Sequence, residues 1–291
     1  LFDPQTILNP GVIFNDDPEC YIKGLKPMPL TNPHVDKCIE CGFCEVNCVS
    51  CGYSGSLSAR QRIVAQREIT RLRTTGEDSA RLARLEKQFE TYGNATCAGD
   101  GLCSMSCPMG NNTGEMIHDL RQASLPKGSM GYKIGDFAAK NLHNITGVFR
   151  PVLSMANFAG KILGDGGVNA IGGALHKVGV PLWTPSLPGA FYSPKVAAQA
   201  SERKVVYFPS CINQTLGQSR EKGKKVETLV DTIIALCNKA GYEVIFPKNM
   251  KKLCCGMIWE SKGMPDIADR KTAELEKALL EASENGKYPV L

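Results

Sequence analysis

Residues 38–48 read CIECGFCEVNC, and this stretch decides how the rest of the chain is interpreted. Four cysteines fall within it, separated by two, two and three residues, out of 13 cysteines in a chain of 291 residues. A disulfide needs two Cβ atoms at a specific separation and orientation, so cysteines crowded in this way suit ligands around one centre better. No secretion signal is recognisable, which favours a reducing, cytoplasmic compartment where clustered cysteines bind metal.

The spacing C-x2-C-x2-C-x3-C is that of bacterial ferredoxins, in which the first three cysteines bind one [4Fe–4S] cluster and the fourth binds another. Each iron needs one thiolate, and two-residue steps wrap successive sulfurs around a small cube. Gly42 lets the backbone approach the cluster, and the apolar side chains of Ile39, Phe43 and Val46 are expected to exclude water. A C-x2-C pair is also a zinc spacing, but four cysteines in one run with a second group downstream favour iron–sulfur clusters.

A second cysteine group follows, and on the same template it reads C-x2-D-x2-C-x3-C-P, with Asp100 in the position of the second ligand. Exchange of the last ligand between the two runs predicts two ligand sets: Cys38, Cys41, Cys44 and Cys107 for the first cluster, and Cys48, Cys97 and Cys103 for the second. The fourth ligand of the second cluster is open. The carboxylate of Asp100 and the thiol of Cys51 are candidates, and with neither a [3Fe–4S] cluster is expected. Asp100-Gly101 is also a common turn dipeptide.

The chain up to residue 200 is expected to be mainly α. Residues 1–30 indicate an extended tail, residues 31–126 a helical domain with both clusters, and residues 127–200 a helical linker region with a proline-rich end at 181–194. Apolar periodicity and breakers predict helices over 57–75, 79–92 and 112–125, the last opened by a capping box of Asn112 and Glu115.

Residues 201–291 change character and predict a truncated α/β unit with a parallel sheet. Buried-strand patterns cover 205–208 and 244–246, helices follow each, and 289–291 indicates the start of a third strand. Three cysteines follow the two strands, where parallel sheets gather their sites, and they predict a further, incomplete metal or disulfide centre: Cys211, Cys254 and Cys255. Cys237 lies on an apolar helix face and is expected to be core.

The net charge of +5 is concentrated in arginines between residues 60 and 84. Acidic residues are interspersed and no nucleic-acid module accompanies them, so a solvated helix face is expected and nucleic acid is not an expected partner. No stretch has the roughly 20 uninterrupted apolar residues of a membrane span. Peripheral contact with the inner face of the cytoplasmic membrane stays open as an alternative.

Three parts of the sequence together resemble a known family. Residues 1–4 (LFDP) and 8–13 (LNPGVI) resemble the end of FAD-linked oxidases of the vanillyl-alcohol-oxidase fold. Residues 38–73, residues 97–108 and the stretch YFPSC at 207–211 resemble the iron–sulfur half of bacterial D-lactate/D-2-hydroxyglutarate-type dehydrogenases. In that family a flavin domain precedes an α-helical ferredoxin domain and a CCG cysteine-rich domain. Two departures are Val49, where a proline is usual, and Asp100.

The resemblance implies that the chain carries single electrons from FAD, bound by an upstream domain of the same polypeptide, through two clusters to an acceptor such as a quinone or a cytochrome. Substrate oxidation would then be performed by residues outside this chain, with Asn9 near the flavin. Two alternatives remain: a separate iron–sulfur subunit, as in glycerol-3-phosphate dehydrogenase or heterodisulfide-reductase-like complexes, and a non-enzymatic metal-binding redox module. The chain is expected to be a fragment, with the further cysteine pair of a CCG domain following residue 291.

Overall fold

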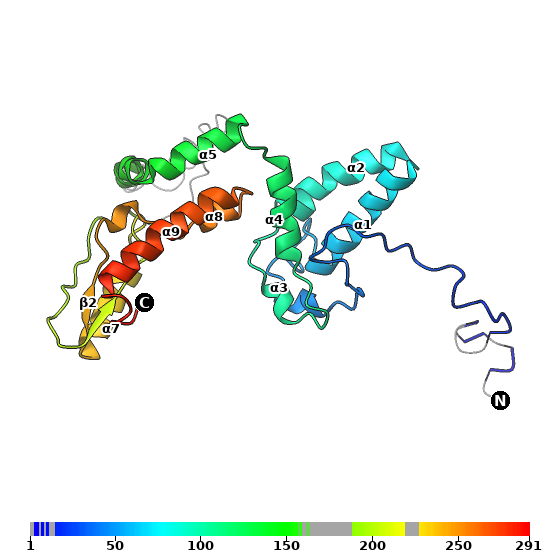
Figure 1. Ribbon diagram of the computed structural model, residues 1–291, viewed down its shortest axis with the longest axis horizontal. Coiled ribbons are helices and arrows are strands. Elements are labelled where there is room, and N and C mark those ends of the chain that lie inside the picture. The colour runs from blue at the N-terminus through cyan, green and yellow to red at the C-terminus, as the bar shows by residue number, and fades with distance from the viewer. Residues whose placement is uncertain are drawn as a thin grey trace. The chain divides into compact units, whose positions relative to one another are not determined.

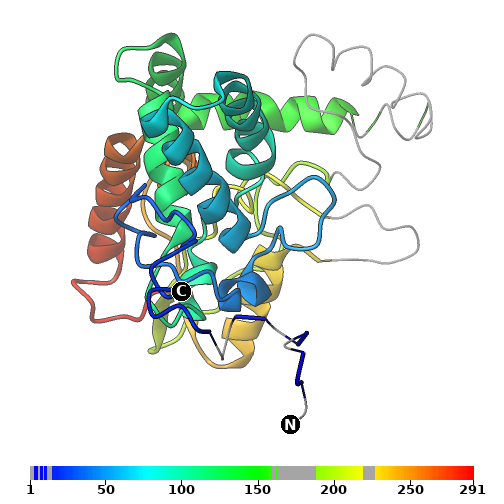
Figure 2. The same ribbon diagram turned by 90° about the vertical axis from the view of Figure 1, so that its right-hand side faces the viewer.

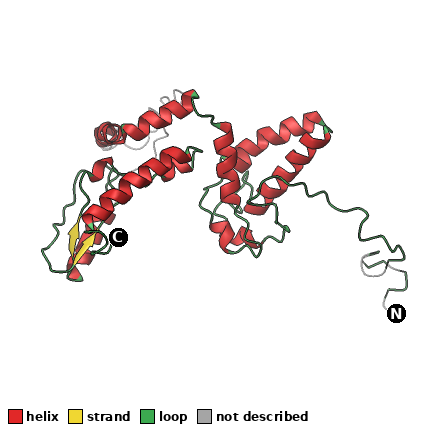
Figure 3. Ribbon diagram, in the orientation of Figure 1, coloured by secondary structure: helices red, strands yellow, loops and turns green. Residues whose placement is uncertain are grey.

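The computed structural model describes residues 3–5, 7–8, 10–11, 15–156, 158, 162, 188–218 and 227–291. Within them the chain is mostly helical and carries a small parallel sheet, which confirms the prediction of a mainly α chain (Figure 3). The chain divides into two compact units, residues 1–120 and 121–291. Asn9, Pro181 and Pro185 lie outside the described residues.

The first unit is built on two neighbouring helices, α1 (Ala59–Thr75) and α2 (Ser79–Phe89), which form a hairpin (Figures 1 and 2). Ser58 opens α1 with a capping box, because its side chain accepts a hydrogen bond from the Gln61 N–H and the Gln61 side chain accepts one from the Ser58 N–H. Gly76 ends α1 with a φ of 70°, a backbone conformation that favours glycine. The α1 and α2 helices thus begin and end close to the predicted limits.

Four further elements complete this unit: the 3₁₀-helix η1 (Phe43–Asn47), the π-helix η2 (Glu90–Asn94), α3 (Leu102–Met105) and α4 (Thr113–Ser124), whose last residues extend into the second unit. The predicted capping box of α4 is wrong. Asn112 Oδ1 accepts a hydrogen bond from the Gly114 N–H, while the Asn112 N–H donates to the carbonyl oxygen of His34 and not to Glu115. The start of α4 is therefore tied to the segment before the first cysteine run.

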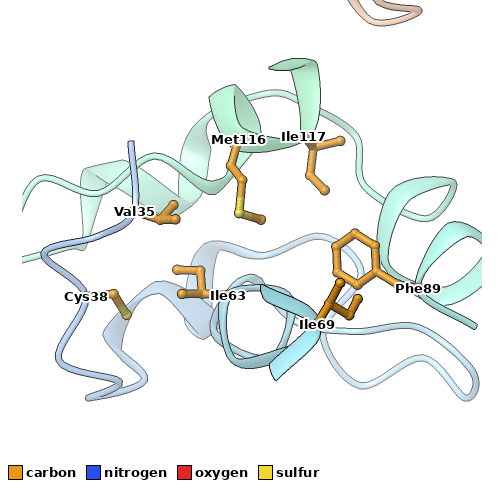
Figure 4. Packing of buried hydrophobic residues seen from close by; sticks show 7 residues of the cluster. All are labelled: Val35, Cys38, Ile63, Ile69, Phe89, Met116 and Ile117. Atoms are coloured by element: carbon orange, nitrogen blue, oxygen red, sulfur yellow. The ribbon is translucent and has the colours of Figure 1, made fainter. Parts of the chain in front are cut away.

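A compact apolar core holds these helices against the first cysteine run. It contains Val35, Cys38, Ile63, Ile69, Phe89, Met116 and Ile117. In Figure 4 the side chains of Ile63 and Met116 point toward one another, and the ring of Phe89 lies beside Ile69. Burial of each large side chain contributes about 1.5–3 kcal/mol, so this core fixes α1 and α4 next to Cys38.

The expectation that the arginines of this region form a solvated face is wrong for two of them. Arg62 is 1 % exposed and Arg67 is 3 % exposed, whereas Arg73 and Arg81 are exposed as expected. Both buried arginines lie on the side of α1 that faces the cysteine runs, since their donated hydrogen bonds end on residues 36–50 and 93–96.

The second unit contains a parallel pair of strands, β1 (Lys204–Val206) and β2 (Glu243–Ile245), with Val205 opposite Val244. The helix α7 (Leu229–Lys239) lies between them in sequence and packs Val230 and Ile234 onto the sheet. Residues 289–291 add a single parallel bridge at Val290 beside Val206, where a third strand was predicted to start.

The described residues of this unit contain further helical segments: α5 (Met130–Lys140), residues 142–156, the 3₁₀-helix η3 (Met250–Lys252), α8 (Met257–Glu260) and α9 (Pro265–Ala282). A second apolar cluster joins α5 to α8 and α9 and includes Trp259, whose Nε1 donates to the carbonyl oxygen of Gly135 at 3.0 Å. Among the described helices, none is both long enough and apolar enough to cross a bilayer.

Candidate functional site

Two small cavities lie in the first unit, and each is lined by cysteines from both runs. The first cavity is lined by Cys38, Cys41, Cys44 and Cys107. Gly42, with a φ of 88°, begins the η1 turn that carries Cys44, and Ile63 of α1 forms part of the wall. Cys107 joins the three cysteines of the first run although more than sixty residues separate it from them in sequence. This is the ligand set expected for the first cluster.

Several N–H groups point at the sulfurs of this first cavity. The backbone N–H of Glu40 donates to Cys38 Sγ at 3.3 Å. Asn111 donates to Cys107 Sγ twice, from its backbone at 3.3 Å and from its side-chain amide at 3.4 Å. Burial raises the pKa of the Cys107 thiol, but these bonds, with those from Met109 and Gly110, outweigh it and leave the pKa below its ordinary value.

Cys44 has the opposite electrostatic environment. Burial, together with the neighbouring thiols of Cys103, Cys38 and Cys107, raises the pKa of its thiol to about 11. Several thiols that disfavour one another's ionisation are held close together, and a cation or a cationic metal core would relieve that repulsion. The electrostatics of the first cavity therefore suit a metal centre.

The second cavity is lined by Cys48, Cys97 and Cys103, together with Asp100. Its remaining wall comes from the start of α1, from the start of α4 and from residues 49–50. Cys48, the last cysteine of the first run, thus lies with the first two cysteines of the second run. The cysteines that line each cavity are thus the same as the cysteines of one predicted ligand set.

Arg62 is the main polar group of the second cavity, and sequence reasoning assigned it to a solvated face. Its guanidinium donates to Cys48 Sγ at 3.6 Å, to Ser50 Oγ at 2.9 Å, to Thr96 Oγ1 at 3.0 Å and to the carbonyl oxygen of Gly93 at 2.7 Å. Burial raises the pKa of Cys48, but hydrogen bonds from Ser50 and then Arg62 lower it below its ordinary value. Cys48 is therefore held in an environment that favours the thiolate.

The structure supports both interpretations of Asp100. Asp100 lines the second cavity, whereas Cys51 is exposed and is not among the described residues that line it. The Asp100 Oδ1 also accepts a hydrogen bond from the Leu102 N–H at 3.1 Å, as in an Asx turn, and Gly101 follows with a φ of 68°. One carboxylate oxygen is thus used by the turn, and the role of the other as a ligand stays a prediction.

The apolar residues of the first run do not exclude water as expected. Ile39, Phe43 and Val46 are 60, 63 and 81 % exposed. The reason is the 3₁₀ geometry of η1, in which side chains three residues apart share a face, so Phe43 and Val46 point outward together. Residues of α1 and α4 also line both cavities.

In the second unit Cys211 and Cys254 are close together. The hydrogen bond with the Cys254 thiol lowers the pKa of Cys211 to about 7, although burial and the nearby Cys255 raise it. The same bond and burial raise the pKa of Cys254 well above its ordinary value. Cys254 is buried and Cys255 exposed, and Cys237 packs against the core of the sheet as expected. Whether the three form a further centre stays a prediction.

Across the described residues, no group of three His, Cys, Asp or Glu side chains is placed to hold a single metal ion. A cubane cluster makes a different demand, because its four irons lie at separate corners and the thiolates surround a volume instead of one point. Each of the two cavities is lined by cysteines from both runs. Comparisons with protein-family models, with curated proteins and with solved structures gave no match for this chain.

Proposed function

We propose that this chain is the electron-transfer part of a flavin-dependent D-2-hydroxy-acid dehydrogenase, with two [4Fe–4S] clusters held by its α-helical ferredoxin domain. The substrate class and the flavin come from the sequence resemblance. The electron-transfer role rests on the cysteines. When bound, such clusters accept and release one electron each.

The observation that carries the proposal is the interleaving of the two cysteine runs. Cys107 lies with the first run and Cys48 lies with the second, as in ferredoxins with two clusters. The first run also differs from interleaved zinc sites, whose cysteines come in separated pairs, because its four cysteines follow the C-x2-C-x2-C-x3-C spacing of ferredoxins. The interleaved sets also bring the two cavities close together, because two successive cysteines of the second run, Cys103 and Cys107, belong to different sets.

The donor set fits iron–sulfur clusters in two further respects. N–H groups of Glu40 and Asn111 point at the sulfurs of the first set, and hydrogen bonds to sulfur are one of the levers by which proteins set cluster potentials. In the second set the guanidinium of Arg62 supplies a positive charge beside thiolates. The chain thus provides thiols as ligands, N–H groups that donate to their sulfurs, and a positive charge that compensates an anionic cluster.

The test is anaerobic reconstitution of the chain with iron and sulfide. We expect about eight iron atoms per chain and a visible absorbance band that bleaches on addition of dithionite. A matched preparation with zinc serves as the comparison. Stoichiometric zinc with no bleachable band would overturn the proposal. The hydroxy-acid part is tested separately, by asking whether the chain, added to its flavin domain, restores electron flow from D-lactate to an artificial acceptor.

A further inference from the structure

Arg62 is a buried cation whose hydrogen-bond partners among the described residues include no carboxylate. Its side chain is 1 % exposed, and its hydrogen bonds go to one carbonyl oxygen, two hydroxyl oxygens and one sulfur. In the part of the chain that the structure describes, no aspartate or glutamate forms an ion pair with it. Asp100 lines the same cavity but is bonded to Leu102.

Arg67 provides a contrast on the same helix. It is 3 % exposed and lies one and a half turns beyond Arg62, but its Nη1 is 3.1 Å from Glu40 Oε1, so its charge is compensated by a carboxylate. Its other Nη donates to the carbonyl oxygens of Asp36 and Cys38. Arg67 therefore fixes the first cysteine run, and its charge does not require a counter-ion from the cavity.

A buried charge without an opposite charge costs several kcal/mol, so a fold that keeps one supplies compensation elsewhere. For Arg62 the groups available are Cys48, at 3.6 Å, and whatever the second cavity holds. We propose that Arg62 is the counter-ion of the second cysteine set and raises the reduction potential of the cluster bound there. This inference rests on the proposed function.

The direction of the effect follows from charge alone. Reduction adds one electron to a cluster that is already surrounded by thiolates, and a fixed positive charge in a poorly hydrated site favours the more negative state. Gly93 is part of the arrangement, because its carbonyl oxygen receives the Arg62 Nε–H, and a Cβ there would lie only 2.8 Å from the ring of Phe89. Arg62 is thus held in a fixed position by its hydrogen bonds and acts on the bound cluster through its positive charge.

The experiment compares Arg62→Gln and Arg62→Lys with Arg73→Gln, at an exposed position on the same helix, in the reconstituted chain, using iron analysis and a redox titration followed by EPR. Arg62→Gln removes the charge and keeps hydrogen-bond donors, whereas Arg62→Lys keeps the charge. We expect Arg62→Gln to lower the ratio of reduced to oxidised second cluster at least tenfold at a fixed applied potential, which corresponds to about 59 mV for a one-electron couple. Arg62→Lys should retain most of the wild-type potential, and Arg73→Gln should leave this cluster unchanged.

Each outcome decides the proposal. Equal potentials of the second cluster in wild type and Arg62→Gln overturn it. If Arg62→Gln loses the second cluster, and with it about half of the iron, while Arg62→Lys keeps it, the counter-ion role is supported by occupancy. Loss of the cluster in both variants alike overturns the charge role in favour of a scaffold of hydrogen bonds. If the wild-type chain binds no cluster, the proposed function fails first, which iron analysis shows independently of the variants.

Discussion

Asn111 donates two hydrogen bonds to the sulfur of Cys107, one from its backbone N–H at 3.3 Å and one from its side-chain amide at 3.4 Å. Asn111 is itself buried, so its amide is held in place and does not exchange this bond freely for water. Cys107 is the residue that links the second cysteine run to the first cavity. The hydrogen bonds from Asn111 therefore act on a proposed ligand of the first cluster, and we expect them to affect the reduction potential of that cluster.

Replacing Asn111 by leucine is expected to lower the reduction potential of the first cluster, because one N–H donor to a proposed ligand sulfur is lost. A net hydrogen bond is worth about 1 kcal/mol, which is about 40 mV for a one-electron couple. An EPR-monitored redox titration measures the shift, and the second cluster in the same molecule is the internal control. A shift confined to the second cluster would contradict the assignment of Cys107 to the first.

The exchange of ligands is tested by paired substitutions. Cys38→Ala and Cys107→Ala should abolish the same EPR signal, and Cys48→Ala and Cys97→Ala should abolish the other, because each pair lines one cavity. Each variant is expected to lose about half of the bound iron. Cys237→Ala is the matched control, since Cys237 packs in the core of the second unit. If Cys107→Ala and Cys97→Ala removed one common signal, the interleaved arrangement would be wrong.

The local elements of the first unit could be predicted from sequence because their signals are local. Ser58 with Gln61, Gly76 and the apolar periodicity of α1 and α2 all act within a few residues. The burial of Arg62 could not be predicted in this way. Its partners lie 12, 14, 31 and 34 residues away along the chain, and a basic residue on a polar helix is usually solvated.

Two other differences between the sequence-based predictions and the structure have equally specific causes. The exposure of Phe43 and Val46 depends on η1 being a 3₁₀-helix, which the cysteine spacing does not reveal. The failure of the Asn112 capping box depends on His34, a residue distant in sequence that accepts the Asn112 N–H. A signal for Arg62 did exist in principle, because it shares its side of α1 with the buried Ile69, seven residues later, whereas Arg60 and Arg71 lie on the opposite side.

Asp231 is expected to stabilise the second unit in a pH-dependent way. Burial raises the pKa of its carboxyl, but hydrogen bonds from Thr228 Oγ1 and from the N–H groups of Val196 and Lys195 lower it below its ordinary value. Its stabilisation is therefore fully present above the unfolded pKa of about 3.9 and is lost as the pH falls through the folded pKa.

Asp231→Asn should accordingly reduce the free energy of unfolding by about 1–3 kcal/mol at neutral pH, and the difference from wild type should shrink below about pH 3.9. Urea unfolding followed by the fluorescence of Trp259 measures it, since Trp259 belongs to this unit. Asp269→Asn, at an exposed position, is the control. A difference that stayed constant across this pH range would show that the charge of Asp231 is not what stabilises the unit.

The last prediction concerns the fourth ligand of the second cluster. Three cysteines line the second cavity, and Asp100 is the residue there whose side chain can supply an anionic oxygen to a fourth iron. Asp100→Ala is therefore expected to convert the second cluster into a [3Fe–4S] cluster, because three thiolates can hold three irons and the fourth iron loses its protein ligand. Iron analysis should fall by about one atom per chain, and a new EPR signal should appear in the oxidised state.

Two further variants separate ligation from the turn that Asp100 also forms. Asp100→Asn keeps an oxygen that can accept the Leu102 N–H, so it preserves the turn while removing the anionic ligand. It should behave like Asp100→Ala if ligation matters and like wild type if only the turn matters. Asp100→Cys restores the complete ferredoxin pattern and should retain a four-iron cluster, with a potential different from that of the wild-type chain because thiolate replaces carboxylate. If Asp100→Ala and Asp100→Asn both kept eight irons while Cys51→Ala lost one, the thiol of Cys51 would be the ligand, reaching the cavity only when the cluster is bound.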